Sequence, residues 1–183
     1  MDPYMNGGLV LAVLAEVLAI LSTALPYWYQ ISVVDEGVAS AGLFEVCGTK
    51  PGIGSICVEY GGQTAFGRQG AEMPDWLKAA QAMMILSVIA HAGGIVLAGM
   101  YAIKVRDWLT LIAASSAATT AGVLFGLIGT AVAGAKFSAL ISPEIRALAV
   151  GSLHAAFGLG VLAVIIGSAA AIVLGVAWRR RVF

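Results

Sequence analysis

Residues able to do covalent or metal chemistry are few in this chain. The sequence contains two cysteines, Cys47 and Cys57, and two histidines, His91 and His154. It contains no Walker loop, no zinc-type cluster of histidine and cysteine, and no Ser-His-Asp constellation. Because catalysis and metal binding need several such groups at defined spacing, we expect a protein that is not an enzyme and holds no metal or cofactor.

Composition points to a membrane protein. Apolar residues make up 60% of the sequence and charged residues 11%, whereas soluble domains have about 45–50% and about 25%. The lipid bilayer is therefore the first partner that we expect. The formal net charge is zero, so we expect no nucleic-acid partner.

Apolar segments long enough to cross a bilayer occur at four places, since a span takes about 20 residues. They cover residues 7–25, 79–103, 108–135 and 148–178. We therefore predict one tetraspan domain over residues 1–183, an all-α membrane protein with a left-handed bundle of four transmembrane helices.

A GxxxG pattern occurs in the third predicted span, formed by Gly122 and Gly126. Small residues let helix backbones approach closely within lipid. We favour packing inside the bundle over a dimer face, because the pattern is common in membrane helices.

Basic residues orient the predicted bundle. An even number of spans puts both termini on one side of the membrane. The turn between the second and third spans and the last residues, 179–183, hold five of the ten basic residues. By the positive-inside rule, we expect both termini in the cytosol of a plasma-membrane protein. Two loops, 26–76 and 136–147, then face outward.

The first outer loop contains β-like runs at residues 29–34, 43–47 and 56–60. Glycines and a proline separate the last two runs, which predicts a hairpin. We expect a small extracellular antiparallel sheet formed by this loop.

Both cysteines fall in this outer loop, 10 residues apart. An even pair in an oxidising compartment is expected to form a disulfide, and redox enzymes use a Cys-X-X-Cys spacing instead. Closing so short a loop contributes about 3 kcal/mol in the chain-entropy model. We interpret the pair Cys47–Cys57 as a structural staple.

Titratable side chains also lie inside the predicted spans. Glu16 and His91 lie near the middle of the first and second spans, at similar depth, and His154 lies nearer the outer end of the fourth. A carboxylate in hydrocarbon is costly, so Glu16 should be neutral or face the bundle interior. A proton or ion relay is one interpretation. We favour a structural hydrogen bond between Glu16 and His91, or to a hydroxyl group of the third span. The candidate hydroxyl groups are those of Ser115, Ser116, Thr119 and Thr120.

Residues around the two cysteines resemble a known family. The pattern consists of Trp28, Gly42, Leu43, Phe44, Cys47 and Cys57. It resembles the W…GLW…C…C signature of the claudin superfamily, with Phe44 in place of the usual second Trp. Residues 23–28 and 77–84 are also similar to the claudin end of helix one and start of helix two. Of the superfamily, which includes epithelial membrane proteins and calcium-channel gamma subunits, the chain is most similar to claudins.

Departures from the claudin pattern concern the cytoplasmic side and one polar residue. Claudins usually carry Arg where this chain has Gln81, which we interpret as an ordinary polar residue near a helix end. The sequence lacks cytoplasmic cysteines for palmitoylation, and residues 179–183 lack the PDZ-binding Tyr-Val ending. We therefore do not expect a PDZ scaffold as partner.

Claudin-like function is what the resemblance implies. We expect a cell-contact membrane protein at cell–cell junctions that self-associates in cis or trans. Its outer sheet would form or modulate a cation-favouring paracellular barrier or channel. In claudins the pore-lining charges lie near the cysteines, which points to Glu59 and Glu45. A solvated loop surface is the alternative interpretation of each acid. The alternative function is an auxiliary, gamma-type subunit bound to a larger ion channel or receptor.

Overall fold

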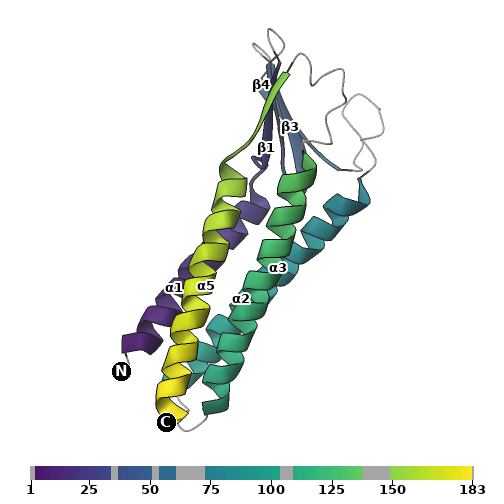
Figure 1. Ribbon diagram of the computed structural model, residues 1–183. Coiled ribbons are helices and arrows are strands. Elements are labelled where there is room, and N and C mark those ends of the chain that lie inside the picture. The colour runs from purple at the N-terminus through teal and green to yellow at the C-terminus, as the bar shows by residue number, and fades with distance from the viewer. Residues whose placement is uncertain are drawn as a thin grey trace.

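The computed structural model describes residues 3–33, 37–50, 54–60, 73–103, 109–137 and 149–182. Four long helices run side by side, and a sheet rises from one end of them (Figure 1). In chain order the elements are α1 (Pro3–Ala24), β1 (Tyr29–Val33), β2 (Gly37–Ala41), β3 (Glu45–Lys50), β4 (Gly54–Glu59), α2 (Asp75–Ile103), α3 (Leu109–Lys136), β5 (Ala149–Leu153) and α5 (Ala155–Val182).

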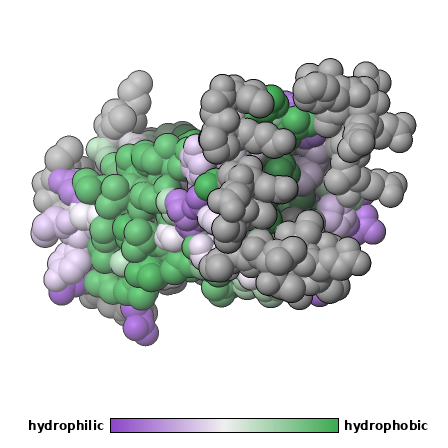
Figure 2. Space-filling model, turned by 90° about the horizontal axis from the view of Figure 1, so that it is seen from above, coloured by the Kyte–Doolittle hydropathy of each residue, from purple (hydrophilic) through white to green (hydrophobic). Residues whose placement is uncertain are grey.

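Each of the four helices is long and apolar enough to cross a membrane. Large apolar side chains cover their outer surfaces; Val10 and Ile172, for example, are each 67% exposed. Figure 2 shows one flank of the bundle covered by hydrophobic residues. In water this surface would be costly, whereas in a bilayer it lies against lipid chains. The predicted four-helix membrane fold is confirmed.

The helices form a ring in which each helix has two neighbours. α1 packs along α5, α5 along α3, α3 along α2, and α2 closes the ring against α1. Both termini lie at the end of the bundle away from the sheet (Figure 1).

Glycine residues and serine hydroxyl groups hold α2 against α3. A Cβ atom on Gly122 would lie 2.9 Å from the ring of His91, and one on Gly126 would lie 2.9 Å from Ser87 Oγ. Ser87 Oγ donates a hydrogen bond to the Gly122 carbonyl at 2.7 Å, and Ser115 Oγ donates to the Gly94 carbonyl at 2.8 Å. The GxxxG pattern therefore packs inside the bundle, as predicted.

The sheet is antiparallel and has five strands in the order β4-β3-β2-β1-β5. Four strands come from the first outer loop, and the hairpin β3–β4 matches the prediction. The fifth strand comes from the segment directly before α5, and it pairs with β1 from Tyr29↔Leu153 to Val33↔Ala149. The predicted sheet from the first loop is confirmed, and β5 adds a fifth strand that we did not predict.

The start of the fourth helix also differs from the prediction. The predicted span 148–178 included residues 149–153, which form β5, and α5 begins at Ala155. Backbone hydrogen bonds fix this change of structure: His154 N donates to the Trp28 carbonyl, and Ala156 N donates to the Tyr27 carbonyl, each at 3.0 Å. The segment extends because the free edge of β1 offers it a partner.

Candidate functional site

Trp28 anchors the base of the sheet in the bundle. It is fully buried, and its Nε1 donates a hydrogen bond to the Ser22 carbonyl at 2.7 Å. Its ring lies 6.1 Å from that of Phe137, at the end of α3, and 6.1 Å from that of Phe157, in α5. The chain leaving α1 is therefore held by two other helices before it enters β1.

Gly42 and Leu43, between β2 and β3, form the second anchor. A Cβ atom on Gly42 would lie 2.6 Å from Pro26 Cα, so only glycine fits without a backbone shift. Leu43 is fully buried, and its carbonyl accepts a hydrogen bond from Gln81 Nε2 at 2.6 Å. Phe44 is 40% exposed and points out of this core.

Tyr60 closes the same turn from the end of β4. Its hydroxyl donates a hydrogen bond to the Gly42 carbonyl at 3.2 Å. Burial raises the pKa of Tyr60 to about 12, so the phenol keeps its proton at neutral pH. We did not predict a role for Tyr60 or Gln81. The sequence did offer one signal for Gln81. Claudins usually carry Arg at this position, and both Arg and Gln supply a hydrogen-bond donor there.

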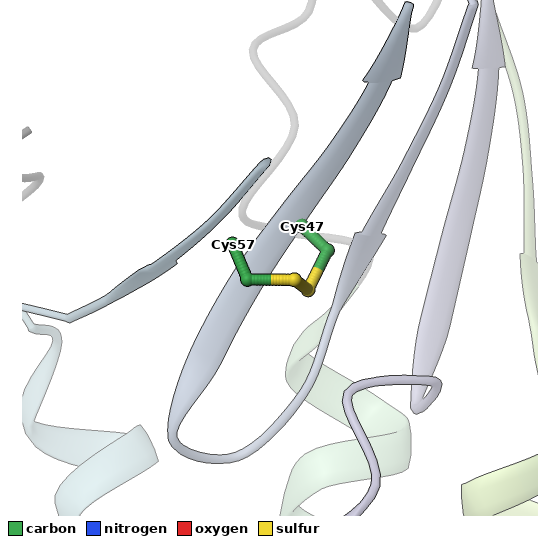
Figure 3. The surroundings of a disulfide bond; sticks show 2 residues. All are labelled: Cys47 and Cys57. Atoms are coloured by element: carbon green, nitrogen blue, oxygen red, sulfur yellow. A yellow bond between two sulfur atoms is a disulfide. The ribbon is translucent and has the colours of Figure 1, made fainter. Parts of the chain in front are cut away.

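Cys47 and Cys57 form a disulfide that bridges β3 and β4 (Figure 3). They lie directly opposite each other in the ladder, with Cα atoms 4.0 Å apart. The predicted staple is confirmed, and it sets the register of the hairpin.

The ladder separates two faces of the sheet, because opposed residues share a face and neighbours along a strand alternate. Tyr29 and Ala41 lie on the face that packs on the core; the ring of Tyr29 stacks parallel to that of Phe137. We call the other side the polar face. Its described side chains are Gln30, Ser32, Val38, Ser40, Glu45, Cys47, Thr49, Ser55, Cys57, Glu59 and Ser152.

Glu45 and Glu59 form one pair on this polar face. They lie directly opposite each other, two residues from Cys47 and Cys57 respectively. Neither carboxylate has an ion-pair partner among the described residues. The salt bridge in that part of the chain joins Lys78 to Asp75. Like charges directly opposite each other are destabilising, so a cation that neutralises part of this charge would stabilise the pair.

No metal site follows from the atoms around this pair. The ligand atoms of Glu45, Cys47 and Cys57 lie within 4.8 Å of one another. Both sulfur atoms belong to the disulfide and cannot act as thiolate ligands.

The intramembrane side chains do not form the hydrogen bonds that we predicted. His91 is 2% exposed, and neither of its ring nitrogens forms a hydrogen bond with Glu16 or with a hydroxyl group among the described residues. The buried Oε2 atom of Glu16 has no hydrogen-bond partner in the described part of the chain. The four candidate hydroxyl groups of α3 donate to backbone carbonyls instead, as Thr119 Oγ1 does to the Ser115 carbonyl. His154 is exposed at the start of α5, with its ring 6.2 Å from that of Tyr27.

Comparison with known proteins agrees with this architecture. The chain matches the PMP-22/EMP/MP20/Claudin family over residues 1–177. A comparison with curated proteins gives no match. The match covers α1, α2, α3, the whole sheet and α5 as far as Ala177, so the chain belongs to the PMP-22/EMP/MP20/Claudin family of tetraspan membrane proteins.

Proposed function

We propose that the protein acts at cell contacts in the plasma membrane, with both termini in the cytosol and the sheet outside. The polar face of the sheet borders a path between cells that favours cations. The opposed pair Glu45 and Glu59 carries this proposal, since both carboxylates lie on that face and neither has an ion-pair partner among the described residues. Family membership supports the architecture and a tendency to self-associate.

The size of the effect follows from Coulomb's law. Two unit charges about 4 Å apart interact by about 1 kcal/mol in water and by about 4 kcal/mol at an effective dielectric constant of 20. A narrow, partly dehydrated path lies between these limits. One carboxylate can therefore change the preference for cations over anions several-fold.

Dilution potentials across sealed cell monolayers test the proposal. Wild type, Glu59→Gln and Glu59→Lys should show cation preference falling in that order, with smaller differences at high salt because exposed charges are screened. Asp75→Asn is the matched control, because Asp75 is an exposed acid at the start of α2, away from the polar face, and is paired with Lys78.

Monolayers that express the wild-type protein without any change in permeability would contradict a path-forming role. The sheet would then bind a larger channel or receptor, as an auxiliary subunit does. In that case replacing Glu45 or Glu59 should change the affinity for that partner instead of the permeability.

A further inference from the structure

Glu16 is a carboxyl group in the middle of α1 that has no hydrogen-bond partner among the described residues. It is half-buried, and its Oε2 atom is buried with no hydrogen bond to any described residue. Serine hydroxyl groups of the bundle behave differently: Ser22 and Ser87 each donate to a backbone carbonyl of another helix. An unpaired polar group in hydrocarbon is costly, so Glu16 would gain from a partner that the described residues do not supply.

Contacts of α1 show on which side of this helix Glu16 lies. The guanidinium group of Arg180 lies 4.2 Å from the ring centroid of Tyr4. Ser22 Oγ donates to the Ala156 carbonyl, so Tyr4 and Ser22 mark the side that faces α5. Glu16 is rotated by about 120° from both residues, in the same sense, at 3.6 residues per turn. Because the other neighbour of α1 is α2, Glu16 lies at the edge between α1 and α2.

The opposite edge of the bundle, between α3 and α5, carries a groove of about 280 Å³. It is lined by Thr120, Val123, Ser168, Ala171 and Ile172. We call this the α3/α5 groove.

Glu16 and the α3/α5 groove lie at a similar depth along the bundle axis. Gly8 packs against Leu174, and Ser22 lies beside Gly160, so α1 and α5 are antiparallel. Glu16 is then level with about residue 166 of α5, and Ser168 lies about 3 Å further along the bundle axis, at 1.5 Å per residue.

The hydroxyl groups of the groove can accept a hydrogen bond. Ser168 Oγ donates to the Val164 carbonyl at 2.7 Å, and Thr120 Oγ1 donates to the Ser116 carbonyl at 2.8 Å. Their protons are used, but their oxygen lone pairs remain available. A neutral carboxyl group supplies the O–H donor that such an oxygen needs.

We propose that Glu16 of one copy enters the α3/α5 groove of a second copy in the same membrane and donates a hydrogen bond to Ser168. Copies inserted in the same direction bring the two groups to matching depths. Because donor and acceptor lie on opposite edges, the contact is head-to-tail and extends into rows instead of closing into a pair. It lies within the membrane and does not depend on an ion path along the sheet.

Cysteine cross-linking in lipid vesicles tests the geometry. Both native cysteines are held in the disulfide, so any cross-link must form between introduced cysteines. Val13→Cys lies on the Glu16 side of α1, and Ile172→Cys lies at the groove; these positions are 44% and 67% exposed. Copies that each carry one substitution should cross-link when mixed. Leu14→Cys is the control, because it is 46% exposed but rotated by about 160° from Glu16.

The control mixture, Leu14→Cys with Ile172→Cys, should give little product, and so should Val13→Cys alone. A strong cross-link between two Val13→Cys copies would show a symmetric pair and overturn the head-to-tail contact. Equal cross-linking from Val13→Cys and Leu14→Cys would show random collisions and overturn it as well.

Energy transfer between labelled copies tests the hydrogen bond. Glu16→Leu should weaken association about three- to eighteen-fold, the range for one such bond in a membrane. Glu16→Gln should associate like the wild type, because the amide also donates. Ser168→Ala should weaken association similarly although α1 is unchanged, and adding Glu16→Leu to it should cause little further loss. The proposal would be refuted if both single variants associated as strongly as the wild type while thermal unfolding showed each of them to be folded.

Discussion

Replacing Gln81 by leucine removes the hydrogen bond that ties the turn at Leu43 to α2. The donor Nε2 lies 2.6 Å from the Leu43 carbonyl, and Leu43 is fully buried, so water cannot take its place. A buried carbonyl left without a donor costs about 1–3 kcal/mol. The loss falls on the attachment of the sheet, because the hydrogen bonds within the helices are unchanged.

Limited proteolysis of the outer loop in lipid nanodiscs measures this attachment. When opening is fast compared with cleavage, the cleavage rate follows the population of the open state. Gln81→Leu should therefore raise the rate about five- to 150-fold. Gln81→Glu should be at least as harmful, because a carboxylate has no donor. Gln81→Arg keeps donors and should stay close to wild type.

A cleavage rate of Gln81→Leu equal to that of wild type would refute the reasoning, since it would mean that the hydrogen bond contributes nothing to holding the sheet. So would a Gln81→Glu variant with normal protection.

Other predictions concern the turn and the staple. Cys57→Ser should lower the free energy of unfolding by about 3 kcal/mol and reduce delivery to the cell surface; thiol labelling of the intact wild-type protein at either cysteine would contradict the disulfide. Gly42→Ala should prevent native assembly of the sheet, since its Cβ would lie 2.6 Å from Pro26 Cα, whereas Gly48→Ala has open space and should be neutral in thermal unfolding. The pKa of Tyr60, about 12 in the fold against 10.0 normally, predicts stability lost as pH rises from 10 to 12. Tyr60→Phe should flatten that alkaline loss, measured as unfolding against pH.

Membrane helices and the hairpin were predictable because their signals are local. A span needs only a run of apolar residues, and the glycines between residues 47 and 57 mark a turn next to two cysteines. The strand β5 gives no such signal. Residues 149–153 are mostly apolar and lead into α5 without a charged break, and their partner β1 lies far earlier in the chain. Hydropathy cannot separate this strand from the first turns of a helix.

Partners of the intramembrane side chains were not predictable for a different reason. Position along a span gives the depth of Glu16 and His91, but not the order of the helices around the bundle. We expected Glu16 to bond to His91 or to a hydroxyl group of the third helix. The third helix is not a neighbour of α1, which packs on α5 and α2, and His91 of α2 does not bond to Glu16 although its helix is a neighbour. The motif residues Trp28 and Leu43 were found because their spacing resembles a family pattern. Hydropathy does not identify their distant partners, which are the ring of Phe137 for Trp28 and the side-chain amide of Gln81 for the Leu43 carbonyl.

The pairing of β5 with β1 determines how the molecule carries a mechanical load. The strands run roughly along the bundle axis, and β1 leaves α1 at the same end at which β5 enters α5 (Figure 1). A pull on the sheet away from the membrane is therefore shared by α1 and α5 and acts along the strands. Hydrogen bonds loaded in this direction resist together, whereas a force that peels one strand breaks them in succession. The ladder from Tyr29↔Leu153 to Val33↔Ala149 should therefore stiffen the sheet against traction.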